Sequence, residues 1–235
     1  MKVAAELCWY DERPKAIREY VGAVAPFVDI LLALDGSYFH YPGGKAQSPP
    51  AQRQALRVAC REHGLKLVER RPRKVWASET AKRKAALELA GKLLTPEDWL
   101  LRLDTDEIAE GNPDGLRRAL ARVPHFDVMG VWFHDREPEP HPRPYAYWSR
   151  RLVRALPDLT AVDAHFVVRA GSGEGLRYLV PYPGQHRPKA DAGEVNPRLL
   201  QVYHRPNRTQ RRLETKRRYY QTVQDLGLEV LPRPR

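Results

Sequence analysis

The chain has 235 residues, of which 42% are hydrophobic and 29% charged, and its formal net charge is +11. This composition is that of a folded globular protein, which excludes a disordered chain, and the length fits one large domain with a substantial core. No apolar run reaches the roughly 18 residues of a membrane span, and the N-terminus lacks the apolar core of a signal peptide. We therefore expect a cytoplasmic protein with no membrane span.

The excess of positive charge predicts an anionic partner, but charge alone does not choose among nucleic acid, a membrane surface and a phosphorylated small molecule. The two cysteines, Cys8 and Cys60, are too few for a disulfide framework or a cysteine-based metal site. We interpret them as small core residues in a reducing compartment.

The first hundred residues alternate between strand-like and helix-like segments. Strands are expected at residues 3–10, 28–34, 65–68 and 99–103, and helices at about 14–24, 51–63 and 78–93. Ser78 is a suitable cap for the third of these helices, and the glycines and prolines of residues 38–50 predict a loop. Repeated strand–helix units predict a parallel sheet, in which ligands bind beyond the carboxyl ends of the strands.

The pattern changes after a short helix near residues 113–122. Strand-like pieces follow at residues 128–133, 145–153, 159–168 and 199–204. Loops rich in proline or glycine separate some of them, one carrying Pro138 to Pro144 and another covering roughly residues 171–198, and such long loops suggest lids or acceptor-binding segments. A basic helix is expected from Asn207 to Leu226.

Carboxylates follow two of the predicted strands where each strand ends. Asp104, Asp106 and Glu107 come directly after residues 99–103, and Asp35 follows residues 28–34. Clustered carboxylates at the end of a core strand suit a hard divalent cation such as Mg²⁺ or Mn²⁺, which takes oxygen ligands. An acidic tip alone is as often a solvated turn, and two such tips on one sheet edge favour the cation site.

Four sequence elements in one order carry a family resemblance. They are Trp9-Tyr10-Asp11-Glu12, Leu34-Asp35-Gly36-Ser37, Lys82-Arg83 and Leu103-Asp104-Thr105-Asp106-Glu107. In this order the chain resembles the family 2 glycosyltransferases of the GT-A fold, over about residues 3–110. The resemblance implies a hexosyltransferase-like enzyme that transfers a sugar from a nucleotide-sugar, with Asp104-Thr105-Asp106 as its DXD motif.

The resemblance also implies an architecture. It predicts an α/β protein of GT-A type, with a single Rossmann-like, mostly parallel sheet flanked by helices, a C-terminal mixed β part and a basic terminal helix. Residues 1–124 would form the nucleotide-sugar-binding half, residues 125–206 the acceptor-side half of the same domain, and residues 207–235 the basic helix and tail.

By the same resemblance, individual residues take roles. Asp106 ligates Mn²⁺ or Mg²⁺, Asp104 faces the metal or the ribose, and His204 adds a further metal ligand. Donor binding falls to Glu12, Asp35, Asp104, Lys82 and Arg83, with the choice between Lys82 and Arg83 left open. Glu107 orients its neighbours. The chain departs from the family pattern around Asp35, where Leu34 and Tyr38 stand in place of further acids.

The predicted chemistry is stabilisation of a diphosphate leaving group by a Lewis-acidic cation. An inverting transferase also needs a base that deprotonates the acceptor hydroxyl. Asp163 and His165 are the candidates for that base, and Asp135 is the competitor. The donor is left open among UDP-, GDP- and dTDP-linked sugars, and the acceptor among a glycan, a protein and a nucleic acid.

Other interpretations of these residues remain. Lys82, Arg83 and Lys84 also fit a solvated helix face, and His204 a structural histidine. A nucleic-acid-binding protein would explain the net charge and the arginines that follow Tyr203, with Tyr219 and Tyr220 beside them. A nucleotidyltransferase would need a glycine-rich phosphate loop after the first strand, which the sequence lacks.

Overall fold

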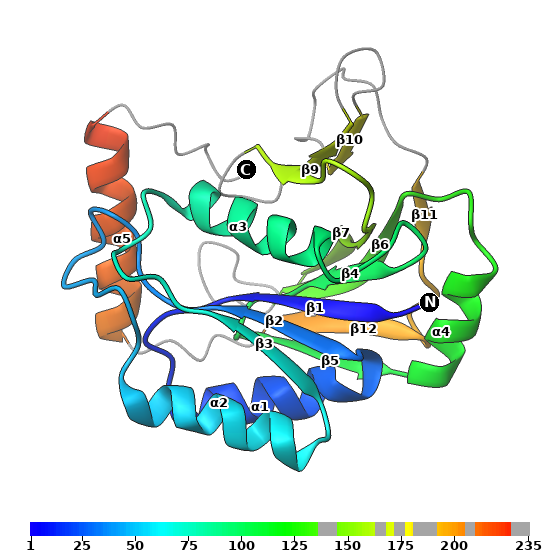
Figure 1. Ribbon diagram of the computed structural model, residues 1–235, viewed down its shortest axis with the longest axis horizontal. Helices are drawn as coiled ribbons and strands as arrows, with labels where there is room; N and C mark the ends of the chain where they lie inside the picture. Colours follow the sequence, from blue (N-terminus) through cyan, green and yellow to red (C-terminus); the bar gives the residue numbers. More distant parts are fainter. Residues whose placement is uncertain (136–144, 163–167, 172–176, 181–191, 205–209, 227–235) are drawn as a thin grey trace.

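The computed structural model describes residues 1–135, 145–162, 168–171, 177–180, 192–204 and 210–226. A curled nine-stranded sheet forms the centre of this part of the chain (Figure 1). Eight of its strands follow the order β3-β2-β1-β4-β7-β6-β12-β5, and β11 also pairs with β6. A separate small sheet contains β8, β9 and β10.

The first half of the chain builds four parallel strands, because each of the first three is followed by a helix that returns the chain to the same end of the sheet. These strands are β1 (Val3–Cys8), β2 (Ile30–Leu34), β3 (Lys66–Arg70) and β4 (Trp99–Arg102). β1 pairs with both β2 and β4, so it lies inside the sheet, and β2 is buried along its whole length. Continuous apolar runs such as Ile30–Leu34 are typical of strands covered on both faces.

Helices cover the two faces of this parallel half. α1 (Pro14–Val24) and α2 (Pro50–Glu62) lie below the sheet in the view of Figure 1, and α3 (Glu79–Gly91) lies above it. Ser78 caps α3 as predicted, with its Oγ accepting a hydrogen bond of 3.0 Å from the backbone N–H of Ala81. A short 3-10 helix, η1 (Ala25–Phe27), follows α1, and α4 (Pro113–Ala121) packs against it.

The second half of the chain completes the sheet with mixed pairing. β6 (Val128–Asp135) and β7 (Tyr145–Arg154) form an antiparallel pair, and β7 also pairs with β4. β12 (Leu200–His204) runs parallel to β6 and antiparallel to β5 (Glu107–Gly111), while β11 (Ala192–Glu194) pairs with β6. The remaining elements are β8 (Thr160–Ala161), β9 (Val168–Ala170), β10 (Arg177–Val180) and α5 (Gln210–Asp225).

The predicted fold class, a mostly parallel α/β sheet flanked by helices with a mixed C-terminal part, is confirmed. Two details differ. β5 was not predicted, because its acids and glycine obscure a strand pattern, and it is a strand through its pairing with β12, far along the chain. β10 and β11 lie inside residues 171–198, which were predicted to be a loop.

None of the described helices combines the length and the apolar composition that crossing a bilayer would require.

Candidate functional site

A pocket of about 670 Å³, including the open space at its mouth, lies at the carboxyl ends of the parallel strands. Its charged members are Glu12, Glu79, Arg83, Asp104 and Asp106. Its tyrosines are Tyr10, Tyr38, Tyr41, Tyr219 and Tyr220, the last two from α5, which stands at this end of the sheet (Figure 1). Cys8, Ser37 and Thr105 complete the lining. Among the described residues, four carboxylates therefore share the pocket with one guanidinium group.

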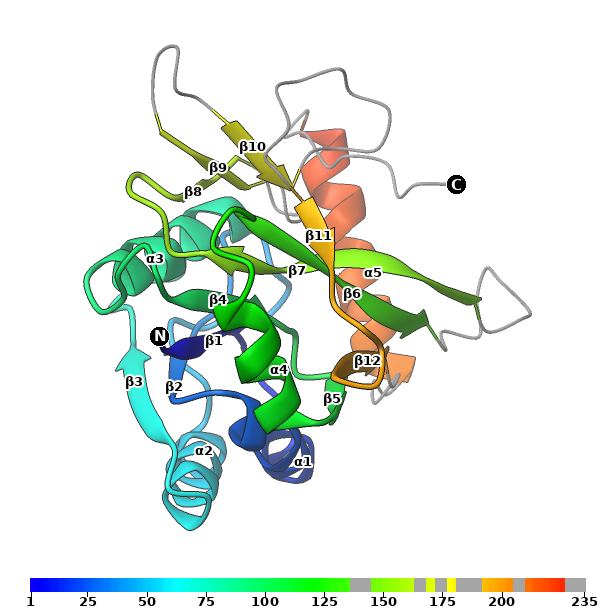
Figure 2. The same ribbon diagram turned by 90° about the vertical axis from the view of Figure 1, so that its right-hand side faces the viewer.

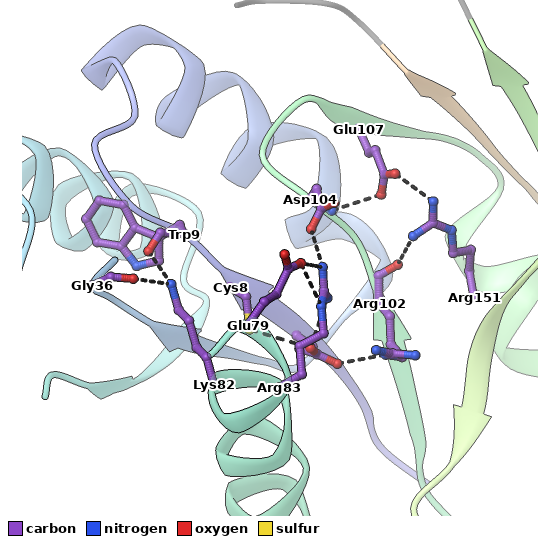
Figure 3. A network of polar contacts seen from close by, with 11 residues as sticks. Cys8, Trp9, Gly36, Glu79, Lys82, Arg83, Arg102, Asp104, Glu107 and Arg151 are labelled. Carbon is purple, nitrogen blue, oxygen red and sulfur yellow. Dashed lines mark hydrogen bonds and ion pairs between the residues drawn. The ribbon is translucent and has the colours of Figure 1, made fainter. Parts of the chain in front are cut away.

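The turn between β4 and β5 carries the predicted DXD residues, and Glu107 holds this turn. The Glu107 carboxylate accepts a 2.9 Å hydrogen bond from the backbone N–H of Asp104 and forms a 2.6 Å ion pair with Arg151 (Figure 3). Burial raises the pKa of Glu107 to about 7, with Asp104 and Asp106 adding to the rise and Arg151 opposing it. These contacts fix the turn, and the orienting role of Glu107 in a metal site stays a prediction.

Asp106 and His204 meet although they come from opposite ends of the sequence. Antiparallel pairing of β12 with β5 sets His204 opposite Glu107, and His204 Nε2 lies 3.3 Å from Asp106 Oδ2. Two ligand atoms at right angles around one Mg²⁺, each about 2.1 Å from it, would lie roughly 3 Å apart. The donor pair therefore fits a shared cation.

The described residues contain no group of three or more histidine, cysteine, aspartate or glutamate side chains that could hold a metal ion. The described residues would supply two donors at this place, the Asp106 carboxylate and the His204 imidazole, and oxygen atoms of the substrate and water would add further ligands. Mg²⁺ sites that work on phosphates are commonly built in this way, because the ion retains waters and shares one or two carboxylates with the phosphate oxygens.

Arg83 is the basic residue of α3 that lines the pocket. Its guanidinium group is 3.0 Å from Glu79 and 3.5 Å from both Asp104 and Glu6 (Figure 3). Arg83 therefore connects two carboxylates of the pocket lining with Glu6 of β1. The Asp104 carboxylate is thus shared with Arg83. The carboxylates of Glu6, Glu79 and Asp104 together compensate the charge of the buried Arg83 side chain.

Lys82, the neighbour of Arg83, is fully buried and points elsewhere. Its Nζ donates hydrogen bonds of 2.7 Å to the carbonyl oxygens of Trp9 and Gly36, which follow β1 and β2 (Figure 3). Burial lowers the pKa of Lys82 to about 8. Lys82 is not part of the pocket lining, so the structure brings Arg83 rather than Lys82 to the predicted nucleotide site.

Asp35 lies on the expected edge of the sheet, but its carboxylate organises a loop. It accepts hydrogen bonds from the backbone N–H of Gly36 at 2.6 Å and from the Ser48 N–H and Oγ at 3.0 and 2.6 Å. Gly36 has a φ of +101°, and a Cβ there would come within 2.3 Å of the Ala46 carbonyl oxygen, so this turn requires glycine. Asp35 does not line the pocket, whereas Glu12 does. A role for Asp35 in donor binding stays a prediction.

The predicted catalytic base is not placed by the structure. Asp163 and His165 lie outside the described residues. The backbone of Asp135 ends β6 and pairs with His204, but its side chain is also outside the description. All three assignments stay predictions.

A buried charged network beneath the pocket was missed by the sequence analysis. Glu6 of β1 and Arg102 of β4 form a 2.8 Å ion pair in which both side chains are about 1% exposed, and Arg151 of β7 reaches Glu107. A signal existed, because Glu6 and Arg102 are single opposite charges in two otherwise apolar strands. Buried charges are paired in native proteins, so such strands are expected to be neighbours.

Comparison with known proteins gives structural likeness only. No protein-family model matches the chain, and no curated protein matches it in sequence. The structure is similar to that of S. aureus TarS residues 1–349, with a TM-score of 0.42, 18% identity and coverage of 61% of this chain and 39% of that one. A second TarS structure gives a TM-score of 0.43 and 18% identity, covering 61% and 23%.

A mannose-6-phosphate isomerase from Helicobacter pylori gives a TM-score of 0.34 and 12% identity, covering 60% of this chain and 53% of that one. The matched region thus spans less than two thirds of each of these proteins. These likenesses concern the path of the chain over part of its length and assign no function, which is proposed below from the residues of the pocket.

Proposed function

We propose that this protein is a metal-dependent glycosyltransferase that moves a sugar, with inversion, from a nucleotide-sugar donor to an acceptor. The observation that carries the proposal is the meeting of Asp106 and His204 at 3.3 Å beside a pocket lined by Asp104, at the strand ends where α/β sheets bind ligands. The sequence resemblance to family 2 glycosyltransferases supports the same activity.

The charge of the pocket supports a cation as part of the site. In the part of the lining that the structure describes, there are four carboxylates and one guanidinium group. A diphosphate without a metal ion would be repelled by this lining. A divalent cation placed between the diphosphate and the carboxylates would attract both. A carboxylate-lined pocket in a chain of net charge +11 is therefore better explained by a metal-bound phosphate than by a free anion.

Asp106 and His204 would hold Mn²⁺ or Mg²⁺, with Asp104 beside them. When bound, the cation would neutralise the negative charge that grows on the diphosphate leaving group. The contacts of Glu107 with Arg151 and the Asp104 backbone keep the turn in place. Arg83, held by Glu79, presents a fixed positive charge to the same space, and Glu12 offers an acceptor for ribose hydroxyl groups.

The donor is assigned to the UDP-, GDP- and dTDP-linked sugars as a class. Removal of the proton from the acceptor hydroxyl is assigned to Asp163 or His165, with Asp135 as the alternative. This base would activate the hydroxyl oxygen, whose single attack on C1 from the face opposite the diphosphate inverts the configuration. Each assignment can be tested by replacing the residue with asparagine or glutamine.

Thermal stabilisation tests the proposal directly. UDP, GDP, CDP and dTDP are added singly with and without Mn²⁺, and one of them is expected to raise the melting temperature only when Mn²⁺ is present. Asp106→Asn is expected to remove this shift. Glu62→Gln, an exposed carboxylate at the end of α2, is the matched control and should retain the shift. No response to any of the four nucleotides would contradict the proposal.

A nucleic-acid-binding protein is the second candidate, favoured by the exposed Arg217 and Arg218 of α5 and the net charge. Against it, Tyr219 is buried against Tyr38 and Tyr41, so its ring is not available to stack on bases. This candidate predicts polynucleotide binding that weakens steeply with salt and does not depend on Asp106. Binding that is weak and insensitive to salt would remove it.

A further inference from the structure

A strip of aromatic side chains lies on one face of β7, β6 and β12, and we call it the aromatic platform. It consists of Trp148, Trp132, His134 and Tyr203. Trp132 pairs with Trp148 across β6 and β7, and His134 pairs with Tyr203 across β6 and β12. Because side chains alternate along a strand, Phe133 and His204 point to the opposite face.

The rings of the platform form a row of neighbouring aromatic groups. The Trp148 and Trp132 centroids are 5.1 Å apart with 66° between the ring planes, and Trp132 and His134 are 6.3 Å apart at 90°. His134 stacks on Tyr203 at 4.4 Å with 6° between the ring planes. Trp148 is 37% exposed, and the other three rings are partly exposed. β6 and β7 run out together from the body of the sheet (Figure 2). None of the four platform residues belongs to the clusters of buried apolar residues.

Polar groups border the rings. His134 Nε2 lies 3.2 Å from Gln201 Oε1. Glu194 of β11 is exposed on the same face, since its Cγ and the Trp148 ring both lie within 3.7 Å of where a Cβ on Gly130 would stand. Arg150 is turned away, with Nη1 donating to the Leu179 carbonyl oxygen at 3.1 Å.

This chemistry favours a neutral sugar chain over the other ligands that stack on aromatic rings. A pyranose ring presents an apolar C–H face to an aromatic ring and hydroxyl groups at its edge, where amide, imidazole and carboxylate groups bind them. Single-stranded nucleic acid also stacks on such rings but needs cations along its phosphates. Among the described side chains of these four strands, the charged ones on this face are Glu194 and the occupied Arg150.

The platform lies near the edge of the sheet that carries the candidate cation site. Tyr203 and His134 stand one residue before the carboxyl ends of β12 and β6, and His204, the last residue of β12, lies 3.3 Å from Asp106. His204 points to the opposite face, so a chain bound across the rings would reach that site around the ends of these strands. We propose that the aromatic platform binds a neutral oligosaccharide, and, if the proposed glycosyl transfer holds, that this oligosaccharide is the acceptor.

Fluorine NMR of protein labelled with 5-fluorotryptophan tests the proposal without any substitution in the platform. The chain has five tryptophans, and the buried Trp9 and Trp99 are internal controls. Cellohexaose, chitohexaose, mannohexaose and galactohexaose are titrated singly to about 20 mM. We expect at least one of them to shift the Trp132 and Trp148 resonances and to leave those of Trp9 and Trp99 in place.

Variants then measure the contribution of stacking. Trp148→Ala is expected to weaken binding of the responding hexasaccharide about fivefold or more, because one stacked ring contributes ~1 kcal/mol or more. Trp148→Phe retains a ring and should bind within about threefold of the parent. Phe39→Ala, which removes an aromatic side chain that is 58% exposed outside the platform, should leave binding unchanged.

Three outcomes would contradict sugar binding by the platform. They are no response to any hexasaccharide, equal binding by the parent and Trp148→Ala, and a response to hexathymidylate in place of the sugars. Stabilisation by nucleoside diphosphate and Mn²⁺, measured on the same samples, separates this proposal from the proposed function. Nucleotide binding without sugar binding overturns the platform alone. Sugar binding that depends on Trp148, without nucleotide binding, supports the platform as a glycan site and rejects the transferase.

Discussion

Two acidic strand ends lie on the same edge of the sheet and differ in what surrounds them. Asp35, after β2, is buried, and its carboxylate is occupied by Gly36 and Ser48. Asp104 and Asp106, after β4, line the pocket, where the Asp104 side chain is 30% exposed. The Asp35 carboxylate stabilises a loop, whereas Asp104 and Asp106 face a space large enough for a ligand. The same sequence feature therefore serves stability at one strand end and, in our proposal, chemistry at the next.

The strongest test of this comparison is Asp106→Asn. The substitution retains the shape of the side chain but removes the charge that a cation requires, so we expect metal-dependent transfer or donor hydrolysis to fall by about a hundredfold or more. The free energy of unfolding should stay within ~1 kcal/mol of the parent, because the change also relieves repulsion among neighbouring acids. Activity assays with Mn²⁺ and urea unfolding measure the two effects. Retained activity would place the cation elsewhere.

Asp35→Ala should show the opposite pattern. It leaves the Ser48 N–H and hydroxyl and the Gly36 N–H without their acceptor, and we expect a loss of about 2–4 kcal/mol in unfolding free energy. Urea unfolding gives this loss, and calorimetry should show a melting temperature lower by several degrees. A stable Asp35→Ala protein that fails to bind nucleotide would instead make Asp35 a ligand.

Lys82 and Arg83 of α3 show the same difference between a structural residue and a pocket residue. The structural contribution of Lys82 can be measured through the pH dependence of the unfolding free energy. Because burial lowers the pKa of Lys82 to about 8 from 10.5, the unfolded chain binds more protons between these values. Unfolding free energy should therefore rise with pH from about 8 to about 10.5, by at most ~1.4 kcal/mol per pH unit, and this gain is absent below pH 8.

Cys8 works against this trend, because desolvation and the nearby Glu6 raise its pKa to about 12, and its thiol resists ionisation as the pH rises. The contribution of Lys82 is therefore measured as the difference from Lys82→Met across the pH range. Lys84→Met, at an exposed position on the same helix, is the control and should follow the parent curve. Identical curves for the parent and Lys82→Met would show that Lys82 keeps its ordinary pKa.

The smallest effect is expected at Ser48. Ser48→Ala removes a hydroxyl that donates to Asp35 at 2.6 Å and accepts from the Asp11 N–H at 3.0 Å, and we expect a loss of about 1–2 kcal/mol. Combined with Asp35→Ala, the two losses should not add, because both report on the same hydrogen bond. Additive losses in this double-mutant cycle would show that Asp35 and Ser48 act independently.

Much of the fold was predictable because it depends on local patterns. Apolar runs such as Ile30–Leu34 and the Ser78 cap are read within a few residues, and they predicted the parallel half and α3. β5 was not predictable in this way, since Glu107–Gly111 forms a strand through hydrogen bonds to β12. The contacts among the pocket tyrosines were not predicted for the same reason, because Tyr38, Tyr41 and Tyr219 meet only through tertiary packing.

By itself, the sequence determined the α/β order, the edge of the sheet at which acids gather and the resemblance that suggested glycosyl transfer. It did not determine which acid faces the pocket or which of Lys82 and Arg83 reaches it, and it placed His204 near Asp106 through the resemblance alone. Those outcomes depend on which strands pair and on which donors already occupy a carboxylate. Pairing joins residues that are distant in the chain, so only the tertiary structure decided them.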